Sequence, residues 1–298
     1  MFKQMLVPLD GSPLAERVLP VACAMAVKCG ATLTLLHVLE KHARPTVHAE
    51  RHLTEPDEAE AYLREATAKL ACGAPRVEHH VHTDRVGHVG RSIVDHANEI
   101  GADVVALTTH GAGGVRRALF GSIAQKVLAH WPRPILLLPS LYADGRGNQK
   151  LEQFLVPVDL DPSHAPAVNL ALDLAHTCQA EVECLGVAAT AATLTGGRSA
   201  TAQVQPFAMA ALLAAEEDEY AERFRQIESA AAALSVSVRS VTDTGPAGPR
   251  ILREIDHRSP DLVIFGSHRR RGLDAAFTGS VGQQLCNRSK SPLLVVPV

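Results

Sequence analysis

The feature that most constrains the fold of this chain is an internal repeat. Residues 6–10, which read LVPLD, return as residues 155–159, which read LVPVD. Further segments return at one constant spacing, namely residues 102–105, 121–122 and 134–139 as residues 260–263, 279–280 and 292–297. A copy of this length is a complete domain in size, so the repeat indicates a tandem duplication and not a solenoid of short units. We therefore expect a first domain over residues 1–141, a linker over residues 142–151 and a second domain over residues 152–298.

Within the first copy, short apolar runs alternate with segments that have the spacing of a helix. We expect strands at residues 5–9, 32–39, 77–82, 103–108 and 135–138, and helices at residues 13–29, 57–70, 92–100 and 118–130. Short apolar strands separated by helices imply a parallel sheet that is covered on both faces, and right-handed crossovers then favour a doubly wound arrangement. The predicted fold class is α/β, with two tandem doubly wound domains, each a five-stranded parallel sheet with helices on both faces.

The composition excludes several other classes of protein. A formal net charge of −3 leaves no basic field that would attract nucleic acid or anionic lipid. No apolar run approaches the roughly 20 residues that cross a bilayer, and the N-terminus carries no signal-peptide pattern. The 6 cysteines contain no C-x-x-C pair, which favours reduced, buried thiols. We therefore expect a cytoplasmic protein without nucleic-acid or membrane partners.

An acidic residue follows the first predicted strand of each copy, Asp10 in the first and Asp159 in the second. Ligands bind doubly wound sheets at the carboxyl ends of the strands, where a carboxylate accepts hydrogen bonds from a sugar hydroxyl or an adenine amine. Turn chemistry offers another interpretation, because Gly11, Ser12 and Pro13 suit a tight turn and the start of a helix. Both interpretations stay open at this point.

A glycine-containing segment follows the fourth predicted strand of each copy. Residues 108–114 lead to Gly121-Ser122 at the start of a helix, and residues 266–269 lead to Gly279-Ser280. Glycines allow backbone amides to approach an anion, and a helix N-terminus adds unpaired N–H groups. The segments therefore indicate a phosphate-binding loop, the alternative being a surface loop with a serine cap. They match neither the lysine-containing P-loop nor the dinucleotide fingerprint.

On these residues, each half resembles a universal stress protein domain, and the whole chain resembles a tandem universal stress protein. The nucleotide-binding pattern of that family is G-x2-G-x9-G-[ST], with an acid after the first strand. The first copy reads T-x2-G-x9-G-S from Thr108 to Ser122, and the second reads G-x2-R-x9-G-S from Gly266 to Ser280. The spacing is kept in both copies, while one glycine of each copy has changed.

The resemblance implies an adenine-nucleotide site at the strand ends, with ATP, with or without magnesium, as the ligand. It assigns adenosine contacts to the acid after the first strand and to backbone at the end of the second, and phosphate contacts to the glycine segment. In the first half these positions are Pro8, Leu9, Asp10, Val38, Thr108, His110, Gly111, Gly121, Ser122 and Ile123. In the second half they are Pro157, Val158, Asp159, Val187, Gly266, His268, Arg269, Gly279, Ser280 and Val281.

The departures from the family pattern favour the first half as the nucleotide site. Thr108 is small, and its hydroxyl is able to donate a hydrogen bond. Arg269 is bulkier, and it either blocks a tight phosphate contact or pairs with phosphate through its guanidinium. The second copy also lacks the counterparts of Gly11 and Ser12. Whether the second half binds nucleotide stays open.

Histidines form two groups that suggest a weaker alternative. His48 and His52 have ligand-like spacing after the second predicted strand, and His79, His80 and His82 lie along the third. The ends of these strands are neighbours in a parallel sheet, so a zinc or other transition-metal site is an option. Solvated histidines are the simpler interpretation.

The predicted function is that of a nucleotide-binding stress-response protein, a sensor or regulator with at most slow ATP hydrolysis. No general base or magnesium-binding acid pair accompanies the phosphate loop. The alternatives are a nucleotide-independent interaction or metal-sensing module, and a weak ATPase in which His110 positions a water. The last strand of each copy would leave an apolar edge exposed. By resemblance the copies pair through these strands as an intramolecular pseudo-dimer, and a further homodimer is left open.

Overall fold

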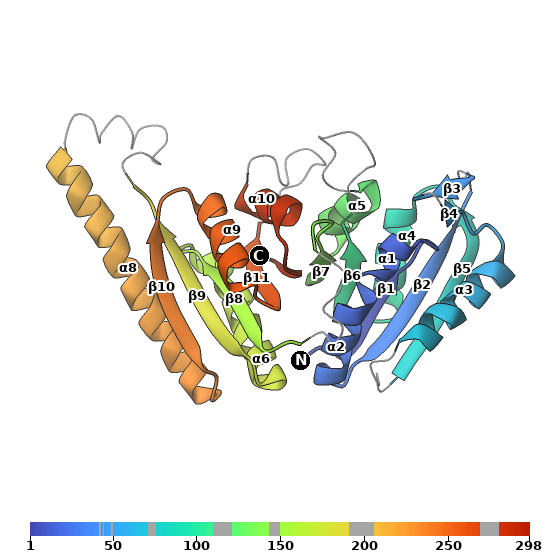
Figure 1. Cartoon of the computed structure of the whole chain (residues 1–298), viewed down its shortest axis with the longest axis horizontal. Coiled ribbons are helices and arrows are strands. Elements are labelled where there is room, and N and C mark those ends of the chain that lie inside the picture. The colour runs from blue at the N-terminus through green and yellow to red at the C-terminus, as the bar shows by residue number, and fades with distance from the viewer. Residues whose placement is uncertain are drawn as a thin grey trace.

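The computed structural model describes residues 1–41, 43, 45–48, 50–70, 76–109, 121–142, 150–190, 206–268 and 280–298. Its main feature is a 10-stranded sheet with the order β10-β9-β8-β11-β12-β7-β6-β1-β2-β5. Five strands come from each half of the chain, and Figure 1 shows the halves side by side with both termini near the middle. The predicted linker lies largely outside the described residues.

The first half contains five parallel strands with helices on both faces. The strands are β1 (Gln4–Pro8), β2 (Thr32–Glu40), β5 (Arg76–Val86), β6 (Val104–Thr108) and β7 (Ile135–Leu138). One face packs against α1 (Pro13–Glu16), α2 (Leu19–Cys29) and α3 (Pro56–Lys69), and the other against α4 (Val89–Glu99) and α5 (Ser122–His130). Strand residues alternate between the two cores, because successive side chains of a strand point to opposite faces.

The second half repeats this arrangement of five parallel strands with helices on both faces. Its strands are β8 (Gln153–Val158), β9 (Glu181–Ala188), β10 (Val238–Thr244), β11 (Leu262–Ser267) and β12 (Leu293–Pro297). The short 3-10 helix η1 (Pro162–His164), α6 (Ala165–Cys178) and the long α8 (Pro206–Ala233) lie on one face, and α9 (Ala247–Arg258) and α10 (Val281–Arg288) on the other. The predicted fold class is confirmed in each half.

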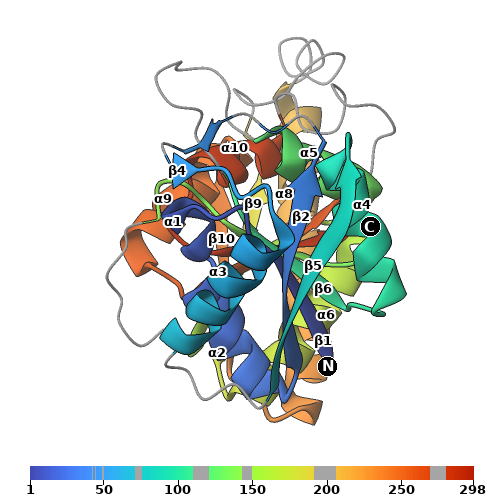
Figure 2. The same ribbon diagram turned by 90° about the vertical axis from the view of Figure 1, so that its right-hand side faces the viewer.

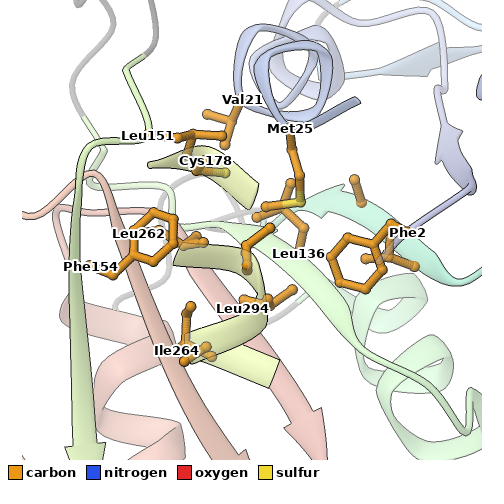
Figure 3. Close-up of a cluster of buried hydrophobic side chains, with 14 of the residues drawn as sticks. Phe2, Val21, Met25, Leu136, Leu151, Phe154, Cys178, Leu262, Ile264 and Leu294 are labelled. Carbon is orange, nitrogen blue, oxygen red and sulfur yellow. The ribbon is translucent and has the colours of Figure 1, made fainter. Parts of the chain in front are cut away.

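The halves meet where β7 and β12 pair antiparallel, with Leu136 opposite Leu294. Both hydrophobic cores run through this seam and contain residues of both halves. Figure 3 shows Val21 and Met25 of α2 facing Cys178 and Leu151 of the second half, next to the Leu136–Leu294 pair. The two parallel five-stranded sheets are therefore joined by one antiparallel strand pair into a single continuous sheet.

Several elements differ from those predicted. The helix expected over residues 13–29 is two helices, because Pro20 stands in the first turn of α2 and lacks the N–H that a continuous helix would need. A small hairpin of β3 (Thr46–Val47) and β4 (Glu50–Arg51) lies where we expected only a loop. The long helix α8 of the second half begins at Pro206 and continues through the acidic residues 216–219.

The expectation that all thiols are free is wrong for Cys23, which is disulfide-bonded. Cys29, Cys178, Cys184 and Cys286 are free. Burial raises the pKa of Cys29 to about 11 and that of Cys178 and Cys184 to about 12, so these thiols stay protonated near neutral pH. Across the described ranges, no helix has both the length and the apolar character that a bilayer crossing requires.

Candidate functional site

A cavity of about 380 Å³ opens at the carboxyl ends of β1, β2 and β6. In Figure 2 these strand ends lie at the top of the first half, on the same side as β4 and α5. The cavity brings together predicted residues from five separate segments: Pro8, Leu9, Asp10, Val38, Thr108, Gly121, Ser122, Ile123, His48 and His52. The remaining predicted positions of this half, His110 and Gly111, lie outside the described residues.

Asp10 is held in place by the turn that follows β1. Its Oδ1 accepts hydrogen bonds from the Ser12 backbone N–H at 3.0 Å and the Ser12 hydroxyl at 2.6 Å. Ser12 in turn caps α1 by accepting from the Ala15 N–H, and Gly11 has a positive φ of 90° that favours glycine. The second carboxylate oxygen, Oδ2, lies 3.6 Å from Nε2 of His48. Turn chemistry and a ligand-facing carboxylate oxygen therefore coexist at this position.

Thr108 stands in place of the first glycine of the family pattern and lines the cavity. Its hydroxyl lies 3.5 Å from the Ala15 carbonyl, to which it donates, so the side chain points toward α1. Only about 3% of Thr108 is exposed. The change from glycine therefore adds a side chain between β6 and α1, whose residue Ala15 also lines the cavity.

The N-terminus of α5 forms another wall of the cavity, and no described side chain caps it. Its cap residue is Gly121, which has no side chain to offer. The equivalent helix of the second half, α10, is capped by Ser280, whose hydroxyl accepts from the Gln283 N–H at 3.1 Å. The amides in the first turn of α5 are thus suited to bind an anion, whereas one of those in α10 is already engaged.

The corresponding region of the second half holds two imidazole–carboxylate contacts. Nδ1 of His164 lies 3.5 Å from Oδ2 of Asp159, and Nε2 of His268 lies 3.5 Å from Oδ2 of Asp161. The two imidazole rings are 4.7 Å apart. The hydrogen bond to His164 lowers the pKa of Asp159, and the same bond raises the pKa of His164. Like Asp10, which contacts Ser12 and His48, Asp159 is therefore engaged by the chain itself.

Side chains also lie against two other predicted groups of the second half, Gly266 and the Val187 carbonyl. A Cβ added at Gly266 would lie 3.0 Å from Cδ2 of His164, so the imidazole occupies the space beside this glycine. The Tyr220 hydroxyl donates to the Val187 carbonyl at 3.4 Å, the backbone group expected to contact adenosine. Pro157 and Val158 hold the equivalent strand end, Val281 begins α10, and Arg269 and Gly279 lie outside the described residues.

The predicted histidine groups separate in the structure. His48 faces Asp10 and His52 lines the cavity, while the β5 residue His80 stacks on His96 of α4 with ring centroids 4.4 Å apart. In the described part of the chain, no group of three or more histidine, cysteine, aspartate or glutamate side chains is arranged to hold a metal ion.

Several lining residues were not identified from the sequence. Val47, Val89, Ile93 and Glu40 form parts of the cavity wall. The apolar members carried no signal beyond ordinary core patterning, and Val47 belongs to the unexpected hairpin. His164 and Tyr220, which close the second half, are distant in sequence from the groups they contact. Only the position of His164 just after the predicted strand end could have drawn attention to it.

Comparisons with known proteins agree with the geometry. A model of the universal stress protein family matches residues 1–139 and 150–297. A universal stress protein encoded in the QAH/OAS sulfhydrylase 3′ region of Thermus aquaticus is 33% identical over 146 residues, which are 46% of this chain and 99% of that protein. Universal stress protein YxiE of Bacillus subtilis (strain 168) is 26% identical over 149 residues, 46% of this chain and 99% of that protein.

The comparison with solved structures extends over the whole chain. The crystal structure of a universal stress protein from Archaeoglobus fulgidus DSM 4304 matches with a TM-score of 0.66 at 17% identity, covering 99% of this chain and 96% of that one. At this identity the likeness concerns the fold. It shows that the paired arrangement of two halves also occurs in a solved protein.

Proposed function

Because this chain belongs to the universal stress protein family, we propose that its first half binds one adenine nucleotide, ATP in the first place, as a sensor or regulator in a stress response. The observation that carries this proposal is the cavity of about 380 Å³, which joins a carboxylate oxygen to an uncapped helix N-terminus. These are the two chemical features that a nucleoside phosphate needs at opposite ends.

The lining of the cavity suits the parts of such a ligand. Small-molecule sites are typically concave, mostly apolar and supplied with a few polar groups that fix orientation. Apolar side chains such as Leu36, Val38 and Ile93 offer a surface for a flat base, and Oδ2 of Asp10 is placed to accept from a hydroxyl. The first-turn amides of α5 favour phosphate.

The positions of the acidic residues in the cavity favour nucleotide binding without rapid hydrolysis. Among its described lining residues, the carboxylates are those of Asp10 and Glu40, at the ends of β1 and β2. Efficient phosphoryl transfer needs groups that hold magnesium and orient the nucleophile beside the phosphates. Neither acid belongs to the strand or helix that borders the proposed phosphate position. We therefore propose a binding protein, with hydrolysis slow at most.

A binding stoichiometry of one per chain follows from the contacts of the second half. His164 engages Asp159 and occupies the space beside Gly266, and Tyr220 engages Val187. A nucleotide entering this half would have to displace each of these contacts. The first half presents the same strand ends with a cavity.

Titration calorimetry with ATP and AMP tests the proposal, with Asp10→Asn as the variant and Asp159→Asn as the matched control. The Asp10 change removes the charge of the accepting group, and a hydrogen bond to a charged group is typically worth about 1.5–3 kcal/mol, so affinity should fall roughly 10- to 100-fold. The Asp159 change makes the same chemical alteration in the second half and should leave affinity unchanged.

Absence of binding heat and of a thermal shift at millimolar nucleotide would contradict the proposal. Two equivalent sites per chain, or an equal loss in both variants, would contradict the assignment to the first half. Addition of magnesium distinguishes free nucleotide from the magnesium complex as the ligand.

A further inference from the structure

The β3–β4 hairpin places a buried imidazole in the wall of the first-half cavity. His52 directly follows β4 and lines the cavity, and only about 8% of its surface is exposed. Its backbone N–H donates to the Pro45 carbonyl at 3.1 Å, which fixes the position of the residue. Within the described residues, its ring nitrogens form no hydrogen bond or ion pair, and neither nitrogen is completely buried.

The other two imidazoles in the cavity wall differ from His52 in this respect. His37 has Nδ1 2.8 Å from the Leu9 carbonyl and Nε2 3.4 Å from the Leu53 carbonyl. His48 faces the Asp10 carboxylate. Small-molecule sites present a few polar groups in a mostly apolar wall, where the ligand supplies the hydrogen bond that the protein does not. The arrangement at His52 therefore points to a ligand atom as its partner.

The strand order indicates which part of the ligand would contact His52. His52 directly precedes Leu53, whose carbonyl lies 3.4 Å from Nε2 of His37 on β2, whereas the α5 N-terminus follows β6. Strand β1 lies between β2 and β6 in the sheet, so the imidazole and the proposed phosphate position occupy opposite sides of the cavity. The part of a nucleotide that reaches the β2 side is the nucleoside.

We propose that His52 is a specificity-determining residue that hydrogen-bonds the nucleoside of the bound nucleotide, through its sugar hydroxyls or its exocyclic amino group. This inference rests on the proposed function of the first half. A neutral imidazole offers one N–H donor and one nitrogen acceptor, so it is able to pair with either group. The β3–β4 hairpin then supplies the recognition of the nucleoside, while the N-terminus of α5 binds the phosphates.

The test compares the wild-type protein with His52→Phe, His52→Gln and a distant control, His257→Phe on the exposed side of α9. Calorimetry with adenosine, AMP and ATP should show about a 2- to 13-fold loss of affinity in His52→Phe, the usual effect of one hydrogen bond. The loss should be the same factor for all three ligands, because the phosphates do not touch this residue. His52→Gln should recover part of the affinity, and His257→Phe should match the wild type.

Thermal unfolding without ligand separates this role from a structural one. Since His52 has no hydrogen-bond partner among the described residues, His52→Phe should leave the ligand-free Tm unchanged or raise it. Only the ligand-induced rise in Tm should shrink. A ligand-free Tm that falls in both His52 variants would show that the imidazole is structural and would overturn the proposal.

Ligand analogues identify the partner group. Purine riboside lacks the amino group and 2′,3′-dideoxyadenosine lacks the sugar hydroxyls, so His52→Phe should cause no extra loss with whichever analogue lacks the partner. Equal extra losses with both analogues, unchanged affinity for adenosine, or a loss that grows with the number of phosphates would each overturn the proposal. If the wild-type protein binds none of the three ligands, the proposed function itself fails, which is a distinguishable result.

Discussion

Gly266 and His164 show how a glycine of the nucleotide pattern becomes a packing residue. In the first half the equivalent position carries Thr108, whose side chain fills the space beneath α1. In the second half that space belongs to the His164 imidazole, which lies beside a glycine with no Cβ. A larger side chain at one position is thus matched by a smaller one at the other. The two halves therefore fill the same space next to this strand end differently, with the Thr108 side chain in the first half and the His164 side chain in the second.

We expect Gly266→Ala to destabilise the protein by about 1–3 kcal/mol, the usual cost of overpacking. The added Cβ would lie 3.0 Å from Cδ2 of His164 and 3.3 Å from Cγ1 of Val298. Urea unfolding measures the change, and Gly87→Ala is the control, because nothing lies within 4 Å of a Cβ at Gly87.

The double variant Gly266→Ala/His164→Ala decides whether the imidazole is the cause. Removing the ring should make the Gly266 change nearly neutral relative to His164→Ala alone, a coupling between contacting residues. A Gly266→Ala variant as stable as the wild type, or a double variant whose losses simply add, would contradict this account.

At the scale of elements, β5 and α4 share a histidine pair that makes stability depend on pH. His80 of β5 stacks on His96 of α4, and Nε2 of His96 is buried without a hydrogen-bond partner among the described residues. Burial, followed by the neighbouring His80, lowers the pKa of His96; His82 acts in the same direction and Glu99 in the opposite one. The unfolded chain therefore binds this proton more readily than the folded chain does.

A lowered pKa in the folded state fixes the sign of the effect: stability is lost as pH falls below about 6.5, the ordinary value for histidine. We expect the Tm of the wild-type protein to drop between pH 7.5 and pH 5.5 by more than that of His96→Phe, which keeps an aromatic ring against His80. Differential scanning calorimetry at both pH values measures this. Parallel drops in the two proteins would show that His96 does not contribute.

The sequence predicted β1, β2, β6 and β7 because their apolar runs reflect burial on both faces. It indicated Asp10 by its place after the first strand and Ser122 by the glycine segment at a helix start, whereas Val38 was assigned only by the family resemblance. The β3–β4 hairpin has two residues in each strand, too few for any periodicity. His52 was therefore identified only as one of a histidine pair, and its place in the cavity wall depends on the hairpin.

The remaining features that we did not predict from the sequence, the length of α8 and the contacts of Tyr220 and His164, depend on contacts between distant segments. Helix α8 packs into the core from Tyr220 onward, whereas its earlier residue Phe207 is about 91% exposed. Among residues 207 and 210–219 of its first part, whose burial is described, none is buried. The contact of Tyr220 with Val187 and that of His164 with Gly266 follow from tertiary packing, which no local pattern encodes.

At the scale of the whole molecule, the seam between β7 and β12 makes the halves mutually dependent. The seam residues Leu136 and Leu294 are fully buried, and both belong to a core that contains residues of both halves. Further contacts cross between the halves, such as the hydrogen bond from Lys28 Nζ to the Cys178 carbonyl at 3.2 Å. We therefore expect the halves to unfold together, although each has the size of a domain.

A substitution in one half and a reporter in the other test this cooperativity. The chain has 1 tryptophan, and Trp131 is buried in the first half, so its fluorescence follows that half alone. Leu294→Ala lies in the second half, and a buried leucine truncation typically costs about 2–5 kcal/mol. Urea unfolding followed by tryptophan fluorescence and by circular dichroism should shift together to lower denaturant.

Leu212→Ala on α8 is the matched control, since it makes the same chemical change at an exposed leucine and should move neither curve by more than about 0.5 kcal/mol. If the Trp131 transition stayed at its wild-type midpoint while the circular dichroism curve split into two steps, the halves would be independent folding units. A joint shift would instead mean that the seam couples the cavity of the first half to the packing of the second. Strand β7 forms the seam with β12, and α5 directly precedes β7 in the chain. A partner that loosened β12 would therefore also act on α5, the helix that borders the cavity.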